Sequence, residues 1–391
     1  MKKCYRLIRS LLPLVGAMAC SPTVVHAQSI LPMNQGVAMA PDDWLVGKGR
    51  PWFYRGAPAD TPSEITRREP TSDELPVVEK AKHLFSKQPG KVIALIDGRE
   101  VVYEDSKAPA YEDAYLFSFS VGKTITSMAV GKAICAGKLQ FSTRGDQVIP
   151  ELKGKDLGAV TVVDLLKMAS GMPAGGPGGT AFTPAQNKLW GEGKLNILDT
   201  LLEDRISRSD RGVFSSYKPG EVFLYKSTDP LTLGIMVGNA TGVPFAQWVT
   251  ENVLQAAGIS QSVIIGVDKF SHVQADGNVR MLKDDWIRFA IWVKESSKEP
   301  GCFGDYVRSA MSKQISNGYS PASRKDGKQF SSYGYLTWTD NDIAPNTAWA
   351  VGWGGQRIGW NKSNDRIVIV FSNAENWMSD VYEIAKAWGQ L

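Results

Sequence analysis

The segment Phe117-Ser118-Phe119-Ser120-Val121-Gly122-Lys123-Thr124 carries the strongest signal for the fold in this 391-residue sequence. It opens a stretch with helical spacing, residues 120–136, that stops at Gly137. Residues three apart on a helix are neighbours, so the hydroxyl of Ser120 and the amine of Lys123 can meet. Burial favours the neutral amine, which can take the serine proton and so create a nucleophile. The alternative is a helix-capping serine followed by a surface lysine. The nearly all-apolar helix leaves Lys123 little solvent-facing surface and favours a functional pair.

Tyr225 ends a short apolar stretch that follows a Pro-Gly turn and precedes a predicted helix at 229–239. A tyrosine in such a place can relay protons as phenol or phenolate when a lysine ammonium lies beside it. The alternative is a packed aromatic ring whose hydroxyl bonds to a backbone carbonyl.

A third element is the glycine-rich stretch Ala350-Val351-Gly352-Trp353-Gly354-Gly355-Gln356-Arg357. Glycine lets a ligand or another backbone segment come close, so an N–H of this stretch can stabilise an oxyanion. A strand bulge or tight turn would use glycine in the same way.

The formal charge of +4, from 44 basic and 40 acidic residues, lies entirely in residues 1–27. This segment has basic residues near its start, then an apolar run, then the cleavage-like triplet Val25-His26-Ala27, and it predicts a signal peptide and secretion to the periplasm. Lipidation at Cys20 is the alternative. The run is too short for a transmembrane helix, which needs about 20 apolar residues. The rest of the chain has no basic surplus, which argues against nucleic-acid binding.

The cysteines and histidines give little sign of a metal site. Beyond the leader the sequence has Cys135, Cys302, His83 and His272, without the spacing of a zinc site, so no metal or cofactor is expected. The two cysteines form either a disulfide or two separately buried thiols, and the sequence leaves both open.

Strand patterns lie at both ends of the chain and helical patterns lie between them. Two β-rich runs flank Asp97-Gly98, a strong hairpin signal. Strands are predicted at 91–96, 99–104, 332–337, 348–351 and 366–371, and helices at 74–87, 120–136, 162–168, 195–202, 229–239, 245–256, 284–295 and 379–390. We expect an α+β fold with an antiparallel sheet flanked by helices and a mostly helical inserted domain.

The expected domains are an N-terminal strap (28–70), an α/β domain (71–118 and 276–391) and the helical domain (119–275), with the active site at the junction. A glycine-rich loop is expected at 171–179.

The order of the three elements resembles the serine β-lactamase-related superfamily, which includes class C β-lactamases, esterases and penicillin-binding proteins. The segment 161–172 is similar to the D-L-L-x-M-x-S-G element of that family, and the 6-aminohexanoate-dimer hydrolase type is the most similar branch. The resemblance runs from Val92 to Trp388. It implies the β-lactamase/transpeptidase-like fold and acyl-enzyme chemistry on a small ester, amide or peptide-like substrate, without metal or cofactor.

The resemblance also implies roles for particular residues. Ser120 would be the nucleophile, Lys123 its base and Tyr225 the proton relay, and the N–H groups of Ser120 and Trp353 would form the oxyanion hole. The implied substrate contacts are Ser227, Gly352, Gly354, Gly355 and Gln356.

One departure from the family concerns charge. The Lys-Thr-Gly element of the last strand, whose lysine helps to bind a substrate carboxylate, is missing, and Ser227 replaces the usual asparagine. Arg280 or Arg357 could substitute for that lysine. We therefore expect a hydrolase of neutral or zwitterionic esters or unstrained amides. The alternatives are a β-lactamase or D-Ala-D-Ala carboxypeptidase, and a binding protein without turnover. The oligomeric state is left open.

Overall fold

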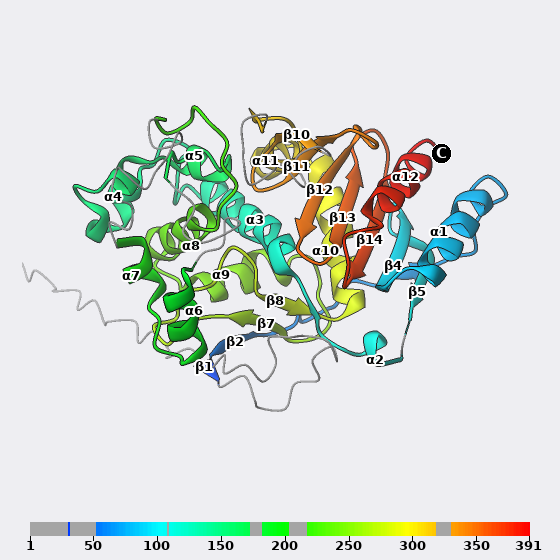
Figure 1. Cartoon of the computed structure of the whole chain (residues 1–391), viewed down its shortest axis with the longest axis horizontal. Coiled ribbons are helices and arrows are strands. Elements are labelled where there is room, and N and C mark those ends of the chain that lie inside the picture. Colours follow the sequence, from blue (N-terminus) through cyan, green and yellow to red (C-terminus); the bar gives the residue numbers. More distant parts are fainter. Residues whose placement is uncertain (1–29, 32–51, 108, 173–181, 203–216, 318–329) are drawn as a thin grey trace, which may run out of the picture.

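The computed structural model describes residues 30–31, 52–107, 109–172, 182–202, 217–317 and 330–391 (Figure 1). The predicted signal peptide, most of residues 28–51 and most of the predicted glycine-rich loop lie outside the described residues. None of the helices in the described ranges is long and apolar enough to cross a membrane.

The larger sheet combines strands from both ends of the described chain, as the sequence predicts. Within the described ranges it has nine strands in the order β3-β5-β4-β14-β13-β12-β11-β10-β9. Neighbouring strands run antiparallel except for the parallel pair β3 and β5. The strands are β3 (Thr66–Arg67), β4 (Gly90–Asp97), β5 (Glu100–Ser106), β9 (Ile315–Ser316), β10 (Phe330–Tyr333), β11 (Trp338–Asn341), β12 (Thr347–Gly352), β13 (Gln356–Asn361) and β14 (Arg366–Ser372).

Helices cover both faces of the middle of this sheet. In β14 every residue from Ile367 to Phe371 is buried, and alternate residues of a strand point to opposite faces. Three helices contact these strands: α1 (Leu75–Lys87), α10 (Lys283–Lys298) and α12 (Met378–Trp388). The indole N–H of Trp388 donates to the carbonyl of Ile96 at 3.0 Å and so attaches α12 to β4.

The hairpin around Asp97-Gly98 is confirmed, with Gly98 in the left-handed region (φ 59°) that favours glycine. The single strand predicted at 332–337 is wrong, because β10 ends at Tyr333 and β11 begins at Trp338. At Gly334 an added Cβ would lie 2.0 Å from the carbonyl oxygen of Ala310, so the chain turns where only glycine fits.

A second sheet was not predicted. Within the described ranges it has five strands in the order β1-β2-β7-β8-β6. They are β1 (Ile30–Leu31), β2 (Phe53–Gly56), β6 (Leu116–Phe117), β7 (Val263–Gly266) and β8 (Val279–Met281). It joins the predicted strap to the end of the predicted helical domain, and β6 leads directly into the segment that contains Ser120.

The middle of the chain is mainly helical, as expected. The predicted helix at 120–136 is a 3₁₀ turn (Phe119–Val121) followed by α3 (Gly122–Cys135). The other helices of this part are α4 (Gly145–Val148), α5 (Val162–Leu166), α6 (Pro184–Gly191), α7 (Ile197–Leu202), α8 (Thr228–Thr241) and α9 (Phe245–Val249). The short helix α11 (Cys302–Ala310) was not predicted.

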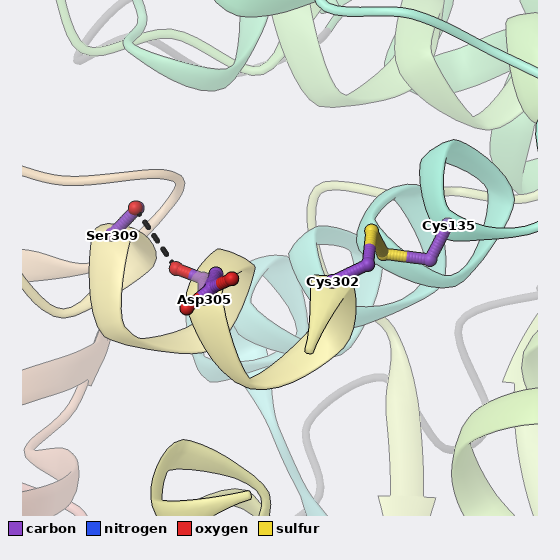
Figure 2. The surroundings of a disulfide bond; sticks show 4 residues. All are labelled: Cys135, Cys302, Asp305 and Ser309. Carbon is purple, nitrogen blue, oxygen red and sulfur yellow. Dashed lines mark hydrogen bonds between the residues drawn. A yellow bond between two sulfur atoms is a disulfide. The ribbon is translucent and has the colours of Figure 1, made fainter. Parts of the chain in front are cut away.

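A disulfide bond joins the last residue of α3 to the first residue of α11 (Figure 2). Cys135 and Cys302 have their Cα atoms 5.7 Å apart and are separated by 167 positions in sequence. Further along α11, the hydroxyl of Ser309 donates to the carbonyl of Asp305 at 2.9 Å. The structure therefore settles the pairing that the sequence left open.

Reduction of this disulfide is expected to lower the free energy of unfolding by about 4 kcal/mol, because the bond closes a long loop in the unfolded chain. Urea unfolding with and without reductant measures the effect. The double variant Cys135→Ser, Cys302→Ser should unfold at one midpoint in both conditions. An unchanged wild-type midpoint, with both thiols titrated as free, would refute this prediction.

Candidate active site

Ser120 lies in the 3₁₀ turn and Lys123 in the first turn of α3, so the predicted helical neighbours do meet. The Nζ of Lys123 is 2.8 Å from the Oγ of Ser120. The side chain of Lys123 is only 2% exposed, which confirms that it has little solvent-facing surface.

The backbone just before Ser120 is strained. Phe119 has φ 45°, in a region that non-glycine residues rarely occupy. Gly277 packs directly against this residue, because an added Cβ at Gly277 would lie 2.6 Å from the carbonyl oxygen of Phe119. Such strain is typical of residues that the surrounding structure fixes for function.

Two neighbouring segments fix this turn in place. Ser118 donates its N–H to the carbonyl of Val279 at 2.8 Å and accepts the N–H of Val279 on its Oγ at 3.0 Å. On the side of β12, an added Cβ at Gly352 would lie 2.6 Å from the carbonyl oxygen of Ser118. Gly352 therefore permits another backbone segment to come close, as the glycines of this stretch predict.

Lys123 has two further neighbours besides Ser120. Its Nζ donates to the carbonyl oxygen of Asp276 at 2.7 Å. It also lies 5.0 Å from the centre of the Tyr225 ring, within the range of a cation–π contact. The structure thus brings Ser120, Lys123 and Tyr225 together from segments about a hundred residues apart in sequence.

Other aromatic rings orient Tyr225. Its ring stacks on Trp338 at 5.3 Å between centres and meets Tyr333 edge-on at 6.4 Å. Burial raises the pKa of Tyr333 well above its usual value, so this neighbour stays a neutral phenol. This aromatic contact could not be predicted from the sequence, because β10 and β11 lie more than a hundred residues after Tyr225.

Directly after Tyr225 lies a buried ion pair that sequence reasoning missed. Lys226 and Asp229 are both fully buried, with Nζ and Oδ2 3.1 Å apart. Asp229 also accepts the hydroxyl of Ser170 at 2.6 Å, and Lys226 donates to the carbonyl of Leu224 at 3.1 Å. Burial is the largest influence on both groups: it lowers the pKa of Lys226 and raises that of Asp229. These bonds fix the segment that carries Tyr225 to the S-G element at Ser170.

The glycine-rich turn between β12 and β13 lies beside the 3₁₀ turn that contains Ser120. Trp353 is 65% exposed and its ring lies 5.3 Å from that of Phe119. Gly354 and Gly355 have φ values of 79° and 90°, which favour glycine. The N–H of Gly354 donates to the Glu375 carboxylate at 3.0 Å, so this amide is used within the turn.

Gln356, for which the resemblance implied a substrate contact, is buried and bonded within the glycine-rich turn. The residue is 1% exposed, and its Nε2 donates to the carbonyls of Trp353 (2.9 Å) and Ser372 (2.8 Å). Its Oε1 accepts the N–H of Ser372 at 3.0 Å. The side-chain amide of Gln356 therefore forms its hydrogen bonds within the protein and stabilises the turn. Ser227 is likewise buried, at 4% exposure, directly before α8.

The two arginines considered as substitutes for the missing lysine are also buried. Arg357 donates to the hydroxyl of Tyr382 and to the carbonyls of Gly352 and Gln356, each at 2.9 Å. Arg280 donates to Asn278 and lies over the Phe117 ring at 4.2 Å. Both guanidinium groups thus have bonds or ring contacts within the protein, and the expectation that one of them replaces the lysine is not supported.

A cavity of about 600 Å³ lies elsewhere, along α8. Phe245, Phe270 and His272 are among its lining residues, and none of the predicted site residues lines it. The candidate active site is therefore assigned from the geometry of its side chains and not from the position of this cavity.

Residues 81–390 match the Beta-lactamase family model, so the chain belongs to the Beta-lactamase family and has a serine hydrolase fold. A Pseudomonas fluorescens β-lactamase is 24% identical over 165 residues, which span 42% of this chain and 40% of that protein's length.

Solved structures agree with this fold. A Bacillus anthracis protein assigned as a 6-aminohexanoate-dimer hydrolase has a TM-score of 0.70 and 17% identity, covering 92% of this chain and 99% of its own. D-alanine carboxypeptidase AmpC from Burkholderia cenocepacia has a TM-score of 0.59 and 15% identity, and the match covers 82% of this chain and 100% of the AmpC chain. At these identities the likeness establishes the fold alone.

Proposed function

We propose that this protein hydrolyses an ester or unstrained amide through an acyl intermediate on Ser120. The observation that carries the proposal is the 2.8 Å contact between Ser120 Oγ and the buried Nζ of Lys123, with the Tyr225 ring beside the same nitrogen. A serine becomes a nucleophile when an adjacent base takes its proton, and this pair supplies both groups.

In the proposed acylation step, Ser120 Oγ attacks the substrate carbonyl carbon while its proton passes to Lys123. The resulting oxyanion would accept hydrogen bonds from the N–H groups of Ser120 and Trp353. The C–O or C–N bond then breaks, and Tyr225 delivers a proton to the departing alcohol or amine. In the second half of the reaction, water attacks the acyl carbon and gives a proton to Tyr225. The bond between that carbon and Ser120 Oγ then breaks, Ser120 Oγ takes back the proton held by Lys123, and the acid leaves.

Replacement of Tyr225 with phenylalanine is expected to lower kcat by about two orders of magnitude, because the ring contacts remain while the proton relay is lost. Steady-state hydrolysis of a p-nitrophenyl ester measures the effect. Tyr103→Phe in β5 removes a hydroxyl outside the site and should leave kcat unchanged. Equal rates for both variants would exclude Tyr225 from the chemistry.

The proposed substrate is neutral or zwitterionic. The lysine that helps to bind a carboxylate in related β-lactamases is absent, and Arg280 and Arg357 are buried against other groups. A panel of a short-chain ester, a linear amide and nitrocefin tests this proposal. Faster turnover of the ester or amide than of nitrocefin supports it. Efficient nitrocefin turnover or stable penicillin labelling would favour a β-lactamase or D-Ala-D-Ala carboxypeptidase instead.

We further propose that the protein is exported. The leader-like composition of residues 1–27 supports this, as does the Cys135–Cys302 disulfide, since such bonds persist in oxidising compartments. N-terminal sequencing of the protein recovered from the periplasm tests the proposal. A first residue of Gln28 is expected, and a protein that keeps its leader in the cytoplasm would contradict it.

A further inference from the structure

Asp276 contacts the candidate base with its backbone and faces it with its side chain. Its carbonyl oxygen lies 2.7 Å from Lys123 Nζ, and its carboxylate Oδ2 lies 4.0 Å from the same atom. The other carboxylate oxygen, Oδ1, is buried and accepts no hydrogen bond from any described residue. The side chain is 12% exposed, so water screens this charge only weakly.

The segment around Asp276 is attached to the nucleophile helix on both sides. The hydroxyl of Thr126 in α3 donates to the carbonyl of Ala275 at 2.6 Å. Gly277 packs against the backbone of Phe119, which its missing Cβ allows, and the missing Cβ of Gly122 allows the close approach of Gly277 to α3. The backbone of Asp276 is therefore held next to Lys123 by the same segments that hold the turn carrying Ser120.

Other ionisable groups lie around Lys123. The Tyr225 ring lies over its Nζ, and Tyr333 lies behind Tyr225. The buried Lys226–Asp229 pair is at the start of α8, which packs against α3. Asp229 is already paired with Lys226, whereas Asp276 is the one acidic side chain within 4.0 Å of Lys123 among the described residues.

We propose that Asp276 is a positioning residue for the catalytic pair, whose carboxylate stabilises the ammonium that Lys123 becomes when it takes the proton of Ser120. This inference rests on the proposed function. The ammonium forms at a site that is almost closed to water, where a negative charge about 4 Å away has a large effect. Asp276 thus acts through Lys123 and need not touch the substrate.

The isosteric variant Asp276→Asn removes the charge and keeps the backbone contact. Without the charge, Lys123 loses its proton at lower pH. The acid limb of the kcat/KM profile should therefore move to lower pH by about one unit, and the plateau rate should fall about tenfold because the base is weaker. Asp276→Glu keeps the negative charge, so the acid limb of its kcat/KM profile should lie nearer to that of the wild-type protein than the limb of Asp276→Asn does. Asp305→Asn, an exposed change of the same charge in α11, should leave the profile unchanged.

A second measurement does not depend on turnover. Lysines labelled with ¹³C next to Nζ report their own titration by NMR, and Lys123→Met identifies the Lys123 signal. The titration midpoint of that signal should move to lower pH in Asp276→Asn. If the asparagine variant does not fold, Asp276→Ala should show the same shift. An unchanged midpoint in a folded neutral variant overturns the inference. If wild-type protein hydrolyses nothing, the proposed function fails, while this titration still decides whether Asp276 stabilises the ammonium.

Discussion

Replacement of Ser120 with alanine is expected to lower kcat/KM for a p-nitrophenyl ester by about four or more orders of magnitude. The acyl intermediate forms on Ser120 Oγ, and removal of the nucleophile from a serine hydrolase leaves only the modest catalysis due to binding and oxyanion stabilisation. The fold should survive, because the side chain is small and lies in the 3₁₀ turn that precedes α3.

Ser127→Ala is the matched control for this variant. Ser127 lies on the same helix, and its buried hydroxyl is 3.0 Å from that of Tyr306 on α11. The control should lose some stability and keep its activity. Wild-type activity in Ser120→Ala would mean that another group carries out the reaction.

The second large effect is expected for Lys123→Ala, which should lower kcat by about two to four orders of magnitude. Without the amine, Ser120 loses the base that lies 2.8 Å from its Oγ. Lys123 is only 2% exposed, so water has little access to its position and is a poor substitute for the base. A small primary amine added to the assay should restore part of the rate, since the truncated side chain leaves room for it.

Lys132→Ala tests whether the loss is specific. Lys132 lies on the same helix, with its Nζ 4.0 Å from the centre of the Phe303 ring. Its replacement should change stability and not kcat. An equal loss of kcat in both lysine variants would indicate that the substitutions damage α3 generally, and that the loss in Lys123→Ala is not due to removal of a base.

Local sequence patterns predicted much of the fold and the members of the candidate site. The hairpin at Asp97-Gly98, the helix at 120–136 and the strand at 366–371 each have a periodic pattern or a specific turn signal, and all three are confirmed. Ser120 and Lys123 could be paired because helical geometry alone makes residues three apart neighbours.

Contacts between distant segments could not be predicted in this way. The five-stranded sheet was missed because its strands have two to four residues each, too few for a periodic pattern. Asp276 meets Lys123 across 153 positions, and its own loop has no unusual composition. The burial of Gln356 within its own turn was not predicted, because a glycine-rich turn can serve a ligand or its own backbone, and only the hydrogen bonds of the amide distinguish the two.

The most direct test of the account is to map a covalent adduct. Wild-type protein treated with a fluorophosphonate probe should gain one adduct, and peptide mass spectrometry should locate it on Ser120. Ser120→Ala should gain none, and Lys123→Ala should react at least a hundredfold more slowly. An adduct on another residue, or no adduct on folded wild-type protein, would contradict the claim that Ser120 is an activated nucleophile and would favour a binding protein on the same fold.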